Sequence, residues 1–262
     1  MSIFSILGAL KAEWQGSIKL CGDNRSRLRL MVDYLLSHGM FAVPRSLMNE
    51  IHEIKTNTGV IIAYRFNRGD LQGIREVWFA EVYKLPFPSP PGAFLDFGAN
   101  IGLTTLWMAT HYPFSRIIAV EPDHENATIL DRNLKRNGIS AEIIEAAIGP
   151  SDGTVYFQKS SWSNLGHVAE EGIPVHMLCV GSLLKEHNVN DVAVVKVDIE
   201  GAEQALFLGP SDWMTYVKAM TVEFHPAAVD YPLLVKTVAS KGFQYFEPTP
   251  QRTDCFLRAA AN

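Results

Sequence analysis

The feature that most constrains this chain is a regular alternation of short apolar runs with helical stretches, which begins at residue 93. The apolar runs occupy 93–97, 116–120, 142–148, 192–197 and 219–224. Helical patterns follow four of them, at 101–111, 124–137, 201–208 and 227–241, and two shorter strands close the chain at 243–246 and 255–257. Strands that are apolar throughout and alternate with helices predict an α/β fold with a mostly parallel, Rossmann-like sheet covered on both faces.

The first 85 residues have a mixed character. A short amphipathic helix is expected at 3–15, and Asp23 or Asn24 can cap a second helix that ends at Gly39. A hairpin is predicted over 51–66 around Thr58-Gly59, and another helix over 70–83. The second helix carries Leu28, Met31, Val32, Leu35 and Leu36 as its expected apolar face.

Prolines in Leu85–Gly92 exclude a helix or a central strand and place a joint there. We therefore expect an N-terminal extension of helices and a hairpin, residues 1–85, and a core, residues 86–262, that contains the alternating strands and helices. The extension would serve as a lid, an acceptor-specificity element or an oligomer contact.

Composition narrows the class of protein. Three scattered cysteines are too few for a disulfide framework or a zinc site, and the N-terminus has neither a signal-peptide pattern nor a spanning helix. We expect a cytoplasmic protein with no membrane partner. A net charge of −5 argues against general nucleic-acid binding.

The strongest local signal is the turn Asp96-Phe97-Gly98-Ala99-Asn100-Ile101-Gly102, between a predicted strand and a helix. Gly98 allows a positive φ, Gly102 would let backbone and ligand approach closely, and Asn100 is a polar turn residue. The helix N-terminus beyond the turn favours negative groups. Glu121 ends the next strand, 23 residues after Gly98, where an acid can take both hydroxyls of a ribose.

The turn also discriminates between ribose cofactors. A nicotinamide site prefers G-x-G-x-x-G, whereas this chain has D-x-G-x-N-x-G. The carboxylate of Asp96 would repel a pyrophosphate but suits the ammonium of S-adenosylmethionine, directly or through water. A purely structural turn remains the alternative.

A cluster of acids and one histidine follows the next two strands. Asp198 and Glu200 share a side of an extended segment with Lys196, and Glu223 and His225 share a side after the neighbouring strand. Methyl transfer to a hydroxyl needs a proton acceptor, and we assign that role to His225, with Glu200 or Asp198 as its orienting group or as the alternative base. Helix capping by the acids and a backbone bond by His225 are the structural alternatives. Glu203 is interpreted as first-turn helix charge.

A metal ion is not favoured. Asp198 and Glu223 are the candidate ligands if magnesium is used, because carboxylates suit that ion. His225 beside them favours a metal-free base mechanism instead.

Further positions are assigned by their place along the chain. Tyr83, Trp78 and Arg75 precede the proline joint and could cap the cofactor or hold its carboxylate, although core packing is the expected fate of Trp78. Ala146 and Ala147 end the third apolar run, where an adenine contacts backbone. The polar segment 161–164 is a candidate wall of the acceptor cavity.

Five motifs in order carry a resemblance to a known family: DFGANIG, AVEPDHENATILDRNLKRNG, AAIGPSDGTVYF, VVKVDIEGAE and VEFHP. Over about 93–226 they resemble the FkbM family of methyltransferases. The resemblance implies the class I methyltransferase fold, a seven-stranded sheet with an antiparallel last strand, and S-adenosylmethionine as methyl donor. One departure is Val180-Gly181-Ser182, where the family often has an Asp, which puts one auxiliary contact in doubt.

The resemblance implies an O-methyltransferase for a small hydroxylated metabolite or sugar, as in secondary metabolite biosynthesis. Three alternatives remain. One is an NAD(P)-dependent oxidoreductase, and a second is a cofactor-binding protein without catalysis. The third is a nucleic-acid methyltransferase, which usually carries a D/N-P-P-Y/F segment where this chain has Asp198-Ile199-Glu200-Gly201. A homo-oligomer formed through the N-terminal extension is possible.

Overall fold

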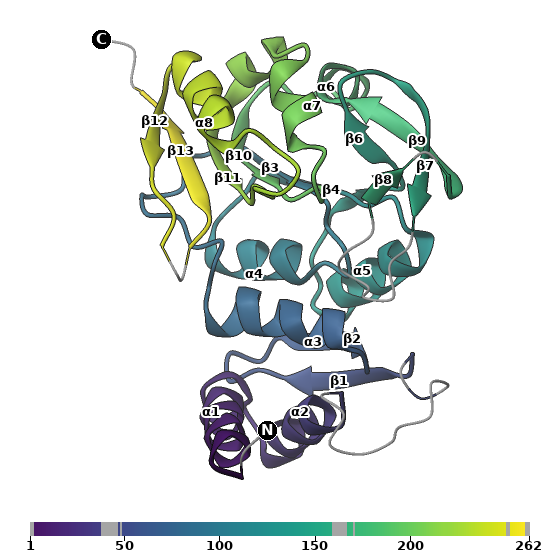
Figure 1. Cartoon of the computed structure of the whole chain (residues 1–262), viewed down its shortest axis with the longest axis vertical. Helices are drawn as coiled ribbons and strands as arrows, with labels where there is room; N and C mark the ends of the chain where they lie inside the picture. The colour runs from purple at the N-terminus through teal and green to yellow at the C-terminus, as the bar shows by residue number, and fades with distance from the viewer. Residues whose placement is uncertain are drawn as a thin grey trace.

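A seven-stranded sheet forms the centre of the protein (Figure 1). The computed structural model describes residues 3–37, 47, 49–158, 167–169, 171–249 and 252–259. The strand order is β12-β13-β11-β10-β3-β4-β5. The strands are β3 (Ala93–Phe97), β4 (Arg116–Val120), β5 (Glu142–Ile144), β10 (Val192–Val197), β11 (Val217–Val222), β12 (Phe243–Phe246) and β13 (Asp254–Arg258).

Only β13 of these seven strands runs against its neighbours, since it pairs antiparallel with both β11 and β12 while the other pairings are parallel. The prediction of a class I methyltransferase sheet with an antiparallel last strand is therefore confirmed. The predicted apolar runs at 93–97, 116–120 and 192–197 coincide with β3, β4 and β10.

The central strands are apolar throughout because both of their faces are buried. Leu95 and Val195 belong to the hydrophobic core on one face, whereas Phe94 and Val194 belong to the core on the other face. Successive side chains of a strand point to opposite faces, so a strand covered on both sides has no position for a solvent-facing residue.

Helices cover the two faces in separate groups (Figure 1). One group is α6 (Val180–Glu186), α7 (Glu203–Leu208) and α8 (Tyr231–Ser240), and the other is α4 (Leu103–His111) and α5 (His124–Arg136). The helix predicted from 227 begins only at Tyr231. Asp230 caps it by accepting a hydrogen bond from the Leu233 amide, and Pro232 lies in its first turn.

The third apolar run, 142–148, is not one strand as predicted. The chain turns after β5, where the Ala146 amide donates to the Ile144 carbonyl, and β6 (Ala147–Gly149) joins a second sheet. That sheet has the order β6-β9-β7-β8, with β7 (Gly153–Gln158), β8 (His167–Ala169) and β9 (Ile173–Cys179). The predicted strand at 154–158 is confirmed as β7.

The N-terminal part lies beyond α4 and α5 (Figure 1). It contains α1 (Ile3–Leu20), α2 (Asn24–Ser37), β1 (Ile51–Lys55), β2 (Ile61–Arg65), α3 (Arg68–Ile74) and a π-helical turn, η2 (Arg75–Phe79). The hairpin is confirmed, with Ile54 opposite Ile62, and Asp23 caps α2 as expected. The first helix is longer than the predicted 3–15, and the helical segment expected to reach 83 ends at Phe79. Among the described residues, no helix combines the length and apolarity needed to cross a bilayer.

The buried face of α2 differs from the predicted apolar one. Leu28 and Val32 are exposed, whereas Asp33 is buried. The Asp33 carboxylate accepts a hydrogen bond of 2.6 Å from the Tyr64 hydroxyl and lies 2.6 Å from Nδ1 of His52. A buried charge needs such partners, so this polar network, rather than apolar periodicity, sets the rotation of α2.

The N-terminal part shares one hydrophobic core with the sheet. Ile54 and Ile62 of the hairpin belong to the same cluster as Phe94, Leu106 and Val194. The stretch 85–92 contains neither helix nor strand, as its prolines predict. The division into two domains at residue 85 stays a prediction, because packing is continuous across it.

The turn after β3 leaves no room for a side chain at Gly98. A Cβ there would lie 1.8 Å from the Asp198 carbonyl oxygen, and φ is +75°. We expect Gly98→Ala to destabilise the protein by about 2–5 kcal/mol, combining a left-handed backbone with overpacking. Gly138→Ala is the matched control, since φ is +66° but nothing lies within 4 Å, and it should cost only about 1–2 kcal/mol. Urea unfolding of both variants measures the difference, and equal losses would contradict the steric argument.

Candidate active site

A cavity of about 430 Å³ opens where β3, β4, β10 and β11 end. The glycine turn after β3 and the acids after the other three strands line it. Ligands of open α/β sheets bind at this edge. The N-terminal part contributes to the wall with Gln72, Gly73, Glu76, Val77 and Tyr83.

A buried ammonium, that of Lys196, holds the glycine turn in place through a hydrogen bond to its backbone. Lys196 is 2% exposed, and its Nζ donates to the Gly98 carbonyl at 2.5 Å and lies 3.2 Å from Oδ1 of Asp96. Burial lowers the pKa of Lys196, but the neighbouring Asp96 and Asp198 carboxylates more than offset this and raise it. Lys196 is therefore a permanent cation.

Asp96 does not line the cavity, although we expected it to face the cofactor. It is fully buried, pairs with Lys196 and accepts a hydrogen bond of 2.6 Å from the Thr105 hydroxyl. Its carboxylate acts on the cavity only through Lys196 and the turn.

Gly102 does not line the cavity either. It has φ of +80° and precedes α4, and a Cβ there would lie 2.3 Å from Cδ1 of Leu130 in α5. The close approach that this glycine permits is between two helices. The other predicted turn residues, Gly98 and Asn100, do line the cavity, and Asn100 adopts a left-handed φ of +50°.

Glu121 follows β4 and lines the cavity, as predicted. Oε2 accepts a hydrogen bond of 2.8 Å from the Asn100 amide, and Oε1 accepts from the Asp123 amide at 3.0 Å and from Nδ2 of Asn126 at 3.1 Å. Burial raises the pKa of Glu121 to about 7 even though these donors favour its ionised form.

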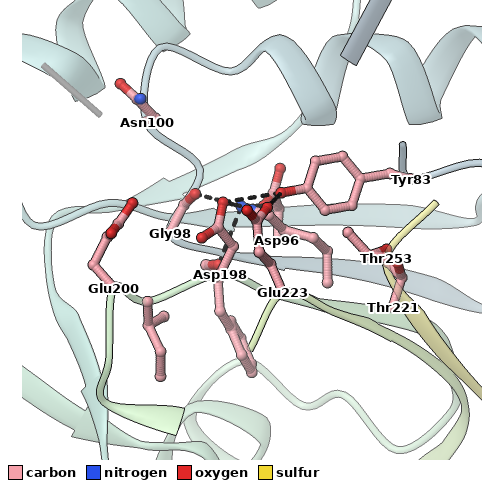
Figure 2. A network of polar contacts seen from close by, with 12 residues as sticks. Tyr83, Asp96, Gly98, Asn100, Asp198, Glu200, Thr221, Glu223 and Thr253 are labelled. Carbon is pink, nitrogen blue, oxygen red and sulfur yellow. Dashed lines mark hydrogen bonds and ion pairs between the residues drawn. The ribbon is translucent and has the colours of Figure 1, made fainter. Parts of the chain in front are cut away.

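Tyr83 points its hydroxyl at two carboxylates, one after β10 and one after β11 (Figure 2). The oxygen lies 2.9 Å from Oδ2 of Asp198 and 2.8 Å from Oε2 of Glu223. Burial and the two carboxylates raise the pKa of Tyr83 well above its usual range, so the phenol keeps its proton.

One hydroxyl hydrogen cannot serve both carboxylates. The second contact therefore needs a proton on a carboxyl group, which donates to the Tyr83 oxygen. Burial and the nearby Asp198 raise the pKa of Glu223 to about 7, so Glu223 can carry this proton near neutral pH.

Glu203, which we expected only to add charge to the first turn of a helix, contacts His225. Nδ1 of His225 lies 2.9 Å from Oε1 of Glu203, which is fully buried at the start of α7. Its Nε2 lies 3.3 Å from Oε2 of Glu200 and 4.0 Å from Oδ1 of Asp198. The hydrogen bond with Glu203 raises the pKa of His225 to about 9 against the effect of burial, so the imidazolium prevails at neutral pH.

We expected Glu200 to lie on an extended segment, but its backbone conformation is different. Its φ is +51°, a left-handed conformation that is strained for a residue with a side chain. This turn carries its carboxylate to His225. Burial and Asp198 raise the pKa of Glu200 to about 7, while His225 opposes the rise.

Asp198, Glu200 and His225 offer ligand atoms within 4.8 Å of one another, a spacing that a metal ion can use. This set differs from the Asp198–Glu223 pair that the sequence suggested. A metal would have to displace the proton from Nε2 of His225. As it stands, the trio is an ion-paired cluster of two acids around an imidazolium.

The structure thus brings together most of the predicted residues and adds others. Lining residues without a distinctive sequence signal are Gln72, Glu76, Asn126 and Phe157. Ala147 lines the cavity, whereas Trp78 does not. Arg75 is also outside the lining and pairs with Glu13 of α1. The segment 161–164, a candidate wall, lies outside the described residues.

Comparisons with known proteins find similarity to methyltransferases. A family model described as the methyltransferase FkbM domain matches residues 96–245, more than half of the chain. "Methyltransferase 1" of Beauveria bassiana is 26% identical over 200 residues, covering 64% of this chain and 79% of that protein. "Methyltransferase sdnD" of Sordaria araneosa is 25% identical over 212 residues, covering 64% and 80%.

One of the solved structures that are similar to this chain is that of methyltransferase FkbM from Methylobacillus flagellatus KT. It is 15% identical, with a TM-score of 0.45, and the alignment covers 96% of this chain and 59% of that chain. This chain therefore spans less than two thirds of that longer protein.

The Glu203 contact predicts a measurable change at His225. Glu203→Gln removes the charge that stabilises the imidazolium, so the pKa of His225 should fall from about 9 by about one to three pH units. Histidine NMR titration measures it. Glu186→Gln, an exposed acid at the end of α6, is the matched control and should leave the titration of His225 unchanged. An unaltered titration in Glu203→Gln would contradict the assigned contact.

Proposed function

The chain belongs to the FkbM methyltransferase family and is a methyltransferase, and on this basis we propose that it is an S-adenosylmethionine-dependent O-methyltransferase acting on a small hydroxylated molecule. The observation that carries the proposal is the set of carboxylates around one cavity. The lining acids are Glu76, Glu121, Asp198, Glu200 and Glu223.

This excess of acids fits a cationic, ribose-bearing donor. Among the described residues, two cations line the cavity, Lys196 and His225, and Lys196 already pairs with Asp96, which does not line it. Glu121 lies where an acid can accept both ribose hydroxyls. A pyrophosphate would meet uncompensated carboxylates, which argues against a nicotinamide dinucleotide.

An apolar part of the cavity suits the adenine. Ala146, Ala147, Ile148 and Phe157 line it and are buried. The predicted role of Ala147 beside the base is therefore retained in this proposal. Tyr83 lies against Asp198 and Glu223, and we assign the methionine portion to this part of the cavity.

S-adenosylmethionine would supply the methyl group to an acceptor hydroxyl. The chain's task is to orient that hydroxyl and to take its proton. An imidazolium has no free lone pair, so we assign proton acceptance to Glu200, the alternative base of the sequence analysis. His225 holds Glu200 in place, and Asp198, fixed by Tyr83, faces the cationic centre.

We also propose that residues 1–85 help to select the acceptor. Gln72, Gly73, Glu76 and Val77 of α3 and η2 form one wall of the cavity. Glu76 in this wall and the other acids that line the cavity disfavour a phosphate backbone, so a small molecule is the acceptor class that we propose rather than a nucleic acid.

Glu121→Ala tests the cofactor assignment. Two hydrogen bonds from the ribose to a carboxylate would be lost, so the Kd for S-adenosylmethionine should rise by about ten- to a hundredfold. Isothermal titration measures this, with NAD as the comparator ligand and Glu186→Ala as the control variant. An unaltered Kd would remove Glu121 from the site, and tight binding of NAD alone would overturn the proposed function.

The pH dependence of turnover tests the proton acceptor. If Glu200 accepts the proton, kcat should rise as pH increases through about 7, where this group ionises. His225→Ala removes the cation that lowers the pKa of Glu200, so this limb should move to higher pH and kcat at pH 7 should fall by about 10². S-adenosylmethionine affinity should be retained.

A control variant and a second possible pH profile distinguish Glu200 from His225 as the base. His176→Ala, at an exposed position of β9, should keep the wild-type profile. A wild-type limb near pH 9 that disappears in His225→Ala would instead make His225 the base.

A further inference from the structure

A chain of buried hydrogen bonds leads from the N-terminal hairpin to Glu121. Arg65, at the end of β2, donates from Nε and Nη2 to the two oxygens of Asp70 in α3, each at 3.0 Å. The same Nη2 donates to Oδ1 of Asn126 in α5 at 2.7 Å. Nδ2 of Asn126 then donates to Oε1 of Glu121 at 3.1 Å.

Every member of this chain is buried. The exposed fractions are 8% for Arg65, 1% for Asp70, 5% for Asn126 and 4% for Glu121. A lost partner leaves a buried polar group unpaired at a cost, so each bond constrains the next side chain.

The chemistry of the donors fixes the orientation of the Asn126 amide. A guanidinium can only donate, so it must face the amide oxygen. The amide NH₂ then has to face the opposite way, toward Glu121. Asp70 in turn fixes the guanidinium, because it accepts two of the three Arg65 side-chain hydrogen bonds and also a hydrogen bond from the Arg65 amide at 2.7 Å.

Asn126 is the only side chain among the described residues that donates a hydrogen bond to Glu121. The other two donors are the backbone amides of Asn100 and Asp123, which the turns hold in place. Asn126, which Arg65 orients, therefore adds the side-chain contact to the two backbone amides that hold this carboxylate.

We propose that Arg65 and Asn126 are positioning residues that hold Glu121 in the orientation that binds the cofactor ribose. This inference rests on the proposed function, because it assigns the ribose to Glu121. It makes the N-terminal hairpin part of the cofactor site, although Arg65 itself does not line the cavity.

The test is a double-mutant cycle read by isothermal titration with S-adenosylmethionine. Arg65→Lys keeps a charge beside Asp70 but cannot form both bonds of the planar guanidinium, and Asn126→Ala removes the donor to Glu121. Each should raise the Kd by about three- to tenfold in the wild-type background. Neither should raise it further in the Glu121→Ala background, because the group that they position is gone.

Asn137→Ala is the matched control. Asn137 follows α5 and also joins it to β2, through its amide oxygen 2.8 Å from the Ile61 amide and its NH₂ 2.7 Å from the Ile61 carbonyl, but it does not touch Glu121. It should lower Tm without changing the Kd. Melting curves of all variants verify that the protein titrated is folded, and Asn126→Ala carries the test if Arg65→Lys does not fold.

The outcomes separate this inference from the proposed function. If Glu121→Ala binds S-adenosylmethionine like the wild type, the ribose assignment fails. If Glu121→Ala weakens binding but Asn126→Ala does not, the positioning role is wrong. Equal losses from Asn126→Ala in both backgrounds would also overturn it, since they indicate a contact that bypasses Glu121.

Discussion

The buried ammonium of Lys196 is the interaction on which the rest of the site depends. It contacts Asp96 of β3, the carbonyl of Gly98 and, at 3.5 Å, Asp198 after β10. The ammonium of Lys196 thereby holds the ends of β3 and β10 and the glycine turn together. Desolvating a cation is costly unless its partners are arranged around it, so the geometry of this edge is set before any ligand arrives.

Among the described residues that line the cavity, the acids outnumber the two cations, Lys196 and His225. Burial and mutual repulsion raise the pKa values of Glu200 and Glu223 to about 7, and burial does the same for Glu121. Part of this electrostatic cost can be relieved by a cationic ligand, which is the physical reason that a sulfonium donor suits the cavity. Tyr83 and His225 organise these acids from opposite sides, one as a neutral phenol and the other as an imidazolium.

The N-terminal part is connected to this chemistry in two ways. Tyr83 and the α3–η2 wall reach the cavity directly, and Arg65 reaches Glu121 through Asn126. Hydrophobic packing joins the same part to the sheet, since Ile62 and Phe94 share one core. A lid that is independent of the core is therefore a poorer description of residues 1–85 than an element packed into it.

The sequence by itself determined the sheet, the glycine turn and the family, because runs such as Val192–Val197 and motifs such as Asp96–Gly102 depend on neighbours along the chain. It also placed Glu121, Glu200 and His225 at one edge, since parallel strands end together. Only the tertiary structure decided that Asp96 faces Lys196, that Gly102 faces Leu130 and that Glu203 binds His225. Side-chain direction and protonation depend on residues distant in sequence, which no local pattern encodes.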